Sequence, residues 1–313
     1  MNRRRIAIGV SSVSGLAVVA LGAVNLFSSG GAAYGGGQSP VDLHTTPVAA
    51  VAAAGPATGR AGTAQVDTLL TMATPALPAQ GKTPAQPAKT ATMHGTGVYD
   101  FGRQTGKIDL KLGTGALEEV LTPGVLYLRS AAASPAAATP AKDWQRADAV
   151  RTSDGNVVSG GATDPAMEFA MLAGTQPGVK FVGQDQVRGV PVAHYQGTLD
   201  LQQAASAPAA AGTPAPAAAV AKQALTNAAH AFTTTKVPFD AYLDEQGRLR
   251  RFVAVFSFTM PGSAKAVAQV TSATELFGFG TPVAVATPTV APAAATPAAT
   301  PPTHSSSPSG THK

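Results

Sequence analysis

The clearest alternation of apolar and polar positions lies between Lys236 and Met260. Every second residue from Val237 to Leu243 is apolar, and this alternation predicts a half-buried β-strand. The segment Asp244–Gly247 then supplies residues typical of a hairpin turn. A second strand returns to Met260, so the pattern predicts a β-hairpin.

The returning strand of this hairpin is apolar on both faces. One face carries Phe252, Ala254, Phe256, Phe258 and Met260, and the other carries Val253 and Val255. A strand of this kind is covered on both sides in a folded protein. We expect one side to meet a core, and the other to meet either a helix layer or an apolar ligand.

The same alternation recurs along the middle of the chain and predicts further strands in consecutive hairpins. They lie within residues 64–73, 90–112, 117–129, 179–201 and 265–276. Strands that are neighbours in sequence usually pair in space. We therefore expect an antiparallel meander.

Two predicted helices interrupt the strands. The first begins at Asp164 and Pro165, which suit the N-cap and the first helical position, and ends near Gly174. The second covers residues 217–232, where the apolar side chains fall on one helical face. Together with the strands, they predict an α+β fold in which helices pack on one face of the sheet.

Composition divides the chain into four parts. Residues 64–286 carry the strand and helix patterns and are expected to form one domain. Residues 34–63 and 287–313 are rich in small residues and proline, and we expect a disordered linker and a disordered tail. Inserts rich in proline and alanine interrupt the domain at residues 74–89, 131–141 and 204–216.

The first 33 residues form the fourth part. Arg3, Arg4 and Arg5 precede an uncharged run of 22 residues, which as a helix would span roughly 33 Å, enough to cross a bilayer core. Small residues at 31–33 also fit a signal-peptide cleavage site. A membrane anchor and a signal peptide both stay open. Either one places the rest of the chain outside the cytoplasmic membrane, because the arginines stay inside.

Charge and cysteine content narrow the function classes. The net charge of +5 falls to +1 without the three N-terminal arginines and Lys313, so we expect no nucleic-acid partner. The chain has no cysteine, which excludes disulfides, thiol nucleophiles and a lipid-modified cysteine.

Titratable residues form no catalytic or metal-binding motif. His94, His194 and His230 fall on polar faces of the predicted elements, and no histidine pair has the spacing of a metal site. The carboxylates of Asp100, Asp109, Glu118 and Glu119 fall where solvated charges are expected on strands. We expect no catalytic residue, no metal and no cofactor.

Several short stretches resemble an actinobacterial family of envelope lipoproteins, the LppX/LprG/LprA/LprF family. They are GTGVYDF (95–101), KDWQRADA (142–149), the helix that begins at Asp164, VRGVPVAHYQGTLDL (187–201), VPFDAYLDEQGRLRRF (237–252) and FGFGTPV (277–283). Their order and spacing cover nearly all of residues 64–286.

The resemblance implies a fold and a function. The family is similar to the lipoprotein carriers LolA and LolB, whose strongly curved antiparallel sheet, a half barrel, is capped by helices over an apolar cavity. Its members carry lipids or glycolipids in the cell envelope. The chain departs from the family at the lipid-attachment site, because Ala23 stands where the acylated cysteine is expected.

Seven apolar residues are candidates for the lining of such a cavity. They are Phe252, Phe256, Phe258, Met167, Phe169, Met171 and Phe232. Phenylalanine and methionine suit an adaptable apolar site. The same residues equally suit an ordinary core between sheet and helices, and the pattern does not distinguish the two.

We therefore expect a non-catalytic lipid or glycolipid carrier that binds acyl chains. The alternative is an envelope sensor or structural protein that recognises another protein through the same domain. In both cases we expect an exported monomer, held at the outer face of the cytoplasmic membrane by an uncleaved N-terminal segment, or secreted.

Overall fold

The computed structural model describes residues 46–79, 84–113, 115–131, 144–159, 163–210, 213–260 and 266–290. The expected N-terminal signal peptide or membrane anchor (1–33) and nearly all of the expected tail (287–313) lie outside these residues. So does nearly all of the insert at residues 131–141.

Eleven strands form one antiparallel sheet in the described residues. They are β1 (Thr63–Thr74), β2 (Lys89–Asp100), β3 (Thr105–Leu112), β4 (Gly115–Thr122), β5 (Val125–Ala131), β6 (Gln145–Asp148), β7 (Lys180–Val187), β8 (Val190–Asp200), β9 (Lys236–Leu243), β10 (Leu249–Thr259) and β11 (Val267–Phe277). The predicted hairpins are all present, and the hairpin that ends at Met260 is formed by β9 and β10.

The sheet consists of two meanders that meet at the first and last strands. Its order is β6-β5-β4-β3-β2-β1-β11-β10-β9-β8-β7. Each strand thus lies beside its neighbours in sequence, except that β1 pairs with β11 and that β6 and β7 are the two opposite edges. Because the chain crosses from one edge to the other between β6 and β7, the sheet is open, and a single continuous meander was too simple a prediction.

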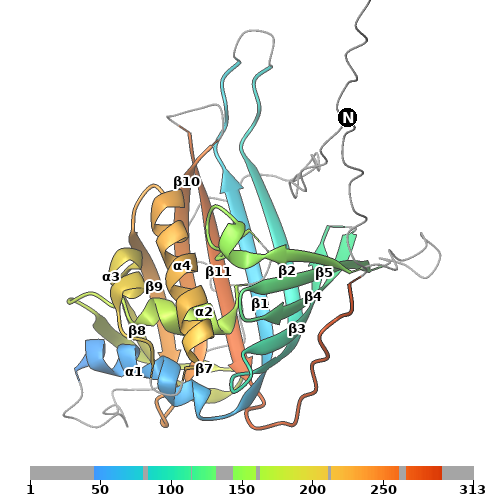
Figure 1. Cartoon of the computed structure of the whole chain (residues 1–313). Helices are drawn as coiled ribbons and strands as arrows, with labels where there is room; N and C mark the ends of the chain where they lie inside the picture. Colours follow the sequence, from blue (N-terminus) through green and yellow to red (C-terminus); the bar gives the residue numbers. More distant parts are fainter. Residues whose placement is uncertain are drawn as a thin grey trace, which may run out of the picture.

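Among the described residues, four α-helices lie against one face of this sheet (Figure 1). They are α1 (Pro47–Gly59), α2 (Pro165–Leu172), α3 (Leu201–Ser206) and α4 (Ala215–Ala231), with a short 3-10 helix, η1 (Ala149–Arg151). The prediction for α2 is confirmed at its start, where the carboxylate of Asp164 accepts a hydrogen bond from Ala166 N–H. The prediction for α4 is confirmed as well.

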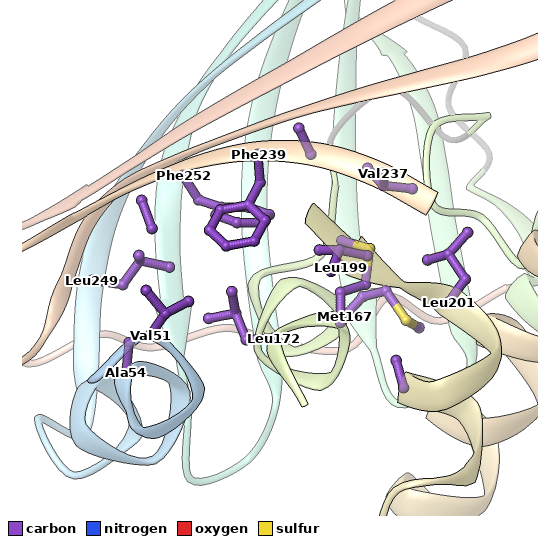
Figure 2. Packing of buried hydrophobic residues seen from close by; sticks show 14 of the residues in the cluster. Val51, Ala54, Met167, Leu172, Leu199, Leu201, Val237, Phe239, Leu249 and Phe252 are labelled. Atoms are coloured by element: carbon purple, nitrogen blue, oxygen red, sulfur yellow. The ribbon is translucent and has the colours of Figure 1, made fainter. Parts of the chain in front are cut away.

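The main core lies between the helices and strands β8, β9 and β10 (Figure 2). We call the helix-covered face of the sheet the inner face. On it, Phe252, Ala254 and Phe256 are each 1% exposed, whereas Val253 and Val255 on the outer face are half-buried. The predicted division of the β10 side chains between two faces is therefore confirmed.

The expectation of a disordered linker at residues 34–63 is wrong for the segment that forms helix α1. The segment Pro47–Gly59 is helical, and Val51 and Ala54 are 0% exposed in the main core. Small residues let this helix approach α2 closely, since a Cβ atom on Gly55 would lie 2.9 Å from Cβ of Phe169. The abundance of alanine and glycine that indicated disorder is what permits this packing.

The expectation for the segment after β8 is also wrong. The end of the strand predicted up to residue 201 and the start of the insert predicted at 204–216 together form a helix, Leu201–Ser206. The carboxylate of Asp200 caps it by accepting a hydrogen bond from Gln202 N–H, and Leu201 is buried. The domain thus begins before residue 64 and uses part of a low-complexity stretch as core.

Candidate functional site

The seven candidate cavity residues converge on the main core. Phe252, Phe256, Met167, Met171 and Phe232 are buried members of it, and Phe169 and Phe258 are partly buried against it. Strand β10 and helix α2 supply six of the seven, and Phe232 follows α4. Strand alternation and helical periodicity are sufficient to bring these side chains to the same side of the sheet.

Aromatic contacts join the helices and the inner face. The rings of Phe232 and Phe256 lie 4.9 Å apart between centroids, tilted by 32°. The rings of Phe239 and Phe252 lie 5.8 Å apart, tilted by 34°. Such offset pairs are favourable beyond the burial of their area. The first of these pairs lies between the end of α4 and the sheet, and the second lies between two neighbouring strands on the inner face.

Polar groups interrupt this apolar interior near α2. The hydroxyl of Thr274 donates a 2.6 Å hydrogen bond to Oε1 of Glu168, and Thr68 lies 3.4 Å from Thr274 through their hydroxyl oxygens. Thr274 pairs directly with Phe252 in the sheet. This polar cluster therefore borders the candidate cavity residues.

Glu168 is buried in an unusual way for a carboxyl group. It is 1% exposed, and its Oε2 atom has no hydrogen-bond partner among the described residues. Burial raises its pKa to about 8, although the hydrogen bond from Thr274 opposes this and the nearby Asp164 carboxylate adds to it. Glu168 is therefore mostly protonated and neutral at pH 7.

Asp164 and Tyr99 complete the polar cluster. The phenol of Tyr99 donates a 2.6 Å hydrogen bond to Oδ1 of Asp164. Burial raises the pKa of Asp164, while the hydrogen bonds from Tyr99 and from Ala166 N–H oppose that rise. Burial likewise raises the pKa of Tyr99 well above 10, so this phenol keeps its proton as a donor.

A small pocket reaches the same region from the surface. It measures about 30 Å³ and lies between the β4–β5 hairpin, the loop at Gly155 and Asn156, and helix α4. Asp164 and Met167 form part of its wall. A space of this size holds roughly one water molecule. Among the seven candidates, Met167 is thus the one that this pocket reaches.

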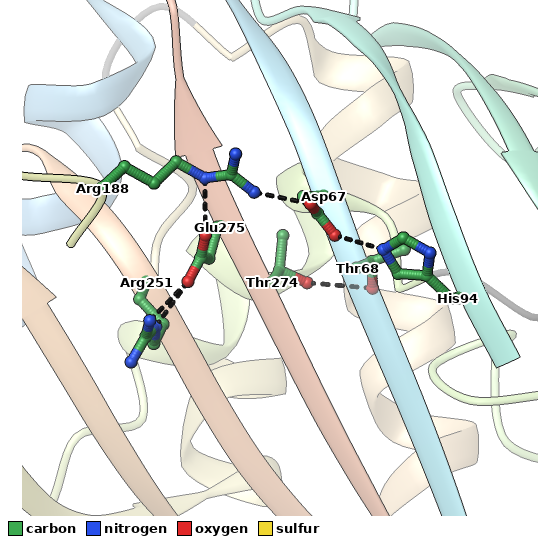
Figure 3. Close-up of polar contacts among 7 residues, drawn as sticks. All are labelled: Asp67, Thr68, His94, Arg188, Arg251, Thr274 and Glu275. Atoms are coloured by element: carbon green, nitrogen blue, oxygen red, sulfur yellow. Dashed lines mark hydrogen bonds and ion pairs between the residues drawn. The ribbon is translucent and has the colours of Figure 1, made fainter. Parts of the chain in front are cut away.

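The outer face carries a network of ion pairs (Figure 3). Arg188, in the turn between β7 and β8, donates to Glu275 through Nε at 2.6 Å and to Asp67 through Nη2 at 2.5 Å. Arg251 also binds Glu275, through Nε at 2.8 Å. His94 lies 2.7 Å from Asp67. The network ties the β7–β8 turn to strands β10, β11 and β1, and it lies opposite the candidate cavity residues.

A larger pocket, of about 300 Å³, lies between the β7–β8 and β9–β10 turns. Val190, Pro191, Val192 and Leu243 form its apolar wall. The carboxylate of Asp244, which is 2% exposed, accepts hydrogen bonds there from Arg248 Nε at 2.9 Å and Arg250 Nε at 3.1 Å. Asp244 also accepts from the N–H groups of Gln246 and Arg248, so its carboxylate caps the predicted turn.

Two carboxyl groups were missed or misplaced by sequence reasoning. Glu119 was expected on a solvated strand position, but it is 0% exposed. It follows Glu118 directly, and neighbouring strand residues point to opposite faces, so only one of the two can reach solvent. Glu168 was not singled out, although a lone acid within the apolar segment AMEFAMLA was a signal for a buried polar group.

The described residues contain no group of three or more His, Asp or Glu side chains suited to a metal ion. His94 and His194 instead pair with Asp67 and Asp240. Among the described helices, none is both long and apolar enough to span a membrane.

Comparison with solved structures returns proteins of low sequence identity to this chain. The lipoprotein LppX from Mycobacterium tuberculosis is 10% identical over 77% of this chain and 98% of its own, with a TM-score of 0.38. LprF from Mycobacterium bovis is 12% identical over 77% and 96%, with a TM-score of 0.37. The ywiB protein from Bacillus subtilis is 7% identical over 69% and 93%, with a TM-score of 0.20.

The first two are members of the family that the sequence resembles. No family model matches the chain, and no curated protein does. The fold defines an α+β protein with an open antiparallel sheet of 11 strands and helices on one face.

Proposed function

We propose that the chain is a non-catalytic carrier that binds the acyl chains of a lipid or glycolipid between its helices and the inner face of its sheet. It would act outside the cytoplasmic membrane as an exported monomer, anchored by its N-terminal segment or secreted. The sheet and helices would then form a half barrel over an apolar cavity, as the family resemblance implies.

One observation carries this proposal. The inner face and the helices present apolar side chains to each other across an interface that spans α1, α2, α3 and α4. Helix–sheet contacts of this kind depend on side-chain packing, not on strand pairing, so they separate at lower cost than the strands. Each ligand methylene buried there would contribute about 0.8 kcal/mol.

The small pocket indicates where α4 would separate from the sheet. It lies between the β4–β5 hairpin and α4, and Met167 lies at its wall. Its volume of about 30 Å³ is far below the hundreds of cubic ångströms that lipid-sized ligands need. Binding therefore requires α4 to move away from the β4–β5 turn, which brings the acyl chain to Met167 and the rings beyond it.

A reversible disulfide between the β4–β5 turn and α4 tests the proposal. A Cβ atom on Gly124, in the β4–β5 turn, would lie 3.7 Å from Cβ of Val220 on α4, within the range of a disulfide. The chain has no cysteine of its own, so the pair Gly124→Cys and Val220→Cys would be the only one. Uptake of a pyrene-labelled acyl probe is measured before and after reduction.

We expect the oxidised double variant to take up little probe and the reduced form to take it up as the wild type does. The single variant Gly124→Cys is the matched control, because Gly124 has a φ of 75° and any side chain there is strained. Equal uptake by oxidised and reduced forms would contradict this access route. A wild-type chain that takes up no probe would contradict lipid binding itself.

A specific observation favours a second candidate function, recognition of another protein. The described interior is filled by its own side chains, as Phe252, Phe256 and Met171 at 0–1% exposure show. The larger pocket, with an apolar wall next to two arginines, lies outside this interior. A chain that binds no lipid and that loses a protein partner on Val190→Asp, at the half-buried rim of that pocket, would fit this second candidate.

A further inference from the structure

Glu168 is a buried carboxyl group whose hydrogen bonds are only half satisfied. Oε1 accepts a hydrogen bond from Thr274, while Oε2 finds no partner among the described residues. Leaving a buried polar atom without a partner costs free energy, so such atoms are rare and call for an explanation. An apolar residue of similar size would fill the same place without that cost.

The surroundings of Glu168 place this oxygen beside the proposed lipid site. Met167 and Met171 lie next to it on α2, and Thr274, its partner, pairs with Phe252 on the inner face. Asp164, one helical turn before it, forms part of the wall of the small pocket. A ligand that entered between the β4–β5 turn and α4 would pass the carboxyl group of Glu168.

We infer that Glu168 is a specificity-determining residue of this site, which donates a hydrogen bond from Oε2 to an acceptor oxygen of the ligand. This inference rests on the proposed function. It also adds a ligand preference, because Glu168 would favour acyl chains that carry a carbonyl oxygen over plain hydrocarbons.

The direction of the hydrogen bond follows from the partners. Because the hydroxyl of Thr274 donates to Oε1, a neutral carboxyl group carries its proton on Oε2. The titratable group that faces Glu168 on its own helix is Asp164, and Tyr99 from β2 donates to that carboxylate. From the sheet, Thr274 and Thr68 face it, and neither titrates. Ionisation of Glu168 removes the proton and turns the donor into a buried anion.

Two probes of equal chain length separate this hydrogen bond from apolar burial. They are 1-dodecylpyrene and the methyl ester of pyrenedodecanoic acid, each titrated into the full-length chain at pH 6 and pH 9.5. The measured quantity is the ratio of the ester affinity to the hydrocarbon affinity. Comparing this ratio between conditions and variants cancels the different solubilities of the probes.

We expect the ratio to fall about two- to tenfold from pH 6 to pH 9.5, the range that one net hydrogen bond gives. Glu168→Leu should lower it by the same factor at pH 6. Glu168→Gln should keep it nearly constant with pH, because the amide donates at both values. Glu119→Gln, a second buried carboxyl on the inner side of the sheet, should leave the pH dependence of the wild type unchanged.

The outcomes are distinct. A ratio that changes neither with pH nor in Glu168→Leu, while both probes bind, overturns the role of Glu168 and leaves the proposed function standing. Loss of the pH dependence in Glu119→Gln also overturns it. Binding of neither probe overturns the proposed function, and the inference with it.

Discussion

The ring of Phe256 on β10 lies against the ring of Phe232 at the end of α4, with centroids 4.9 Å apart. Phe256 is 1% exposed and Phe232 is 7% exposed. This contact joins the long helix to the middle of the sheet. If helix and sheet separate to admit a ligand, as we propose, this contact must open.

Truncation of Phe256 measures how much the contact stabilises the fold. Phe256→Ala should lower the free energy of unfolding by about 3–5 kcal/mol, because it removes a ring from a filled core. Val255→Ala, one residue away on the half-buried outer face, should cost only about 1 kcal/mol. Denaturant unfolding of both variants checks this. Equal losses would show that Phe256 lines a space that is already open.

The ion pairs of the outer face give a second prediction. Glu275 is 1% exposed and is bound by Arg251 and Arg188. Arg251→Met should cost about 3 kcal/mol, because it leaves a buried carboxylate with one partner fewer. Adding Glu275→Met should recover much of this loss, since no buried charge then remains in excess. A double variant less stable than Arg251→Met alone would contradict this account.

Glu168 gives the pH dependence of stability. Its pKa rises from an ordinary value of 4.5 to about 8 on folding, so the folded chain binds its proton more tightly than the unfolded chain. Its contribution to stability is therefore full below about pH 4.5 and is lost as the pH rises to 8. The loss is at most about 1.4 kcal/mol per pH unit.

Urea unfolding at pH 5 and pH 8 measures this change. In Glu168→Gln the decrease should be smaller by a few kcal/mol than in the wild type. The raised pKa of Asp164 acts in the same direction, but it is present in both proteins. Parallel pH profiles for the two proteins would show that Glu168 ionises as easily in the folded state as in the unfolded state.

Helix α1 gives a prediction about the domain boundary. Leu249 N–H donates a buried 2.8 Å hydrogen bond to the hydroxyl of Thr58, and Val51 lies in the main core. A chain that starts at Thr46 should therefore unfold at the same temperature as the longer chain. A chain that starts at Gly62 should unfold at a clearly lower temperature. Equal melting temperatures for both truncations would restore the boundary expected at residue 64.

Strands were predictable because their signal is local. Alternation placed Phe252 and Phe256 on one face and Val253 and Val255 on the other, as the structure has them. Pairing of neighbouring strands explains nine of the ten strand pairings in the described sheet. The contact between β1 and β11 joins the two ends of the domain, and no local pattern indicates it.

Helix α1 and Glu168 show where sequence reasoning failed. The alanine-rich segment of α1 has little intrinsic amphipathicity, and tertiary contacts with α2 and β10 give it its place. The burial of Glu168 depends on Thr274, more than 100 residues away in sequence. The seven candidate residues lie in one interior, but alternation does not say whether they line a ligand site.

The most direct test of lipid binding is native mass spectrometry of the full-length chain, purified from the organism that makes it, followed by extraction of any bound lipid. The proposal predicts a mass shift by one lipid or a narrow set of lipids, and a smaller bound fraction in Phe256→Ala than in Val255→Ala. A chain that is consistently without lipid, in wild type and variants alike, would contradict the proposal and favour recognition of another protein.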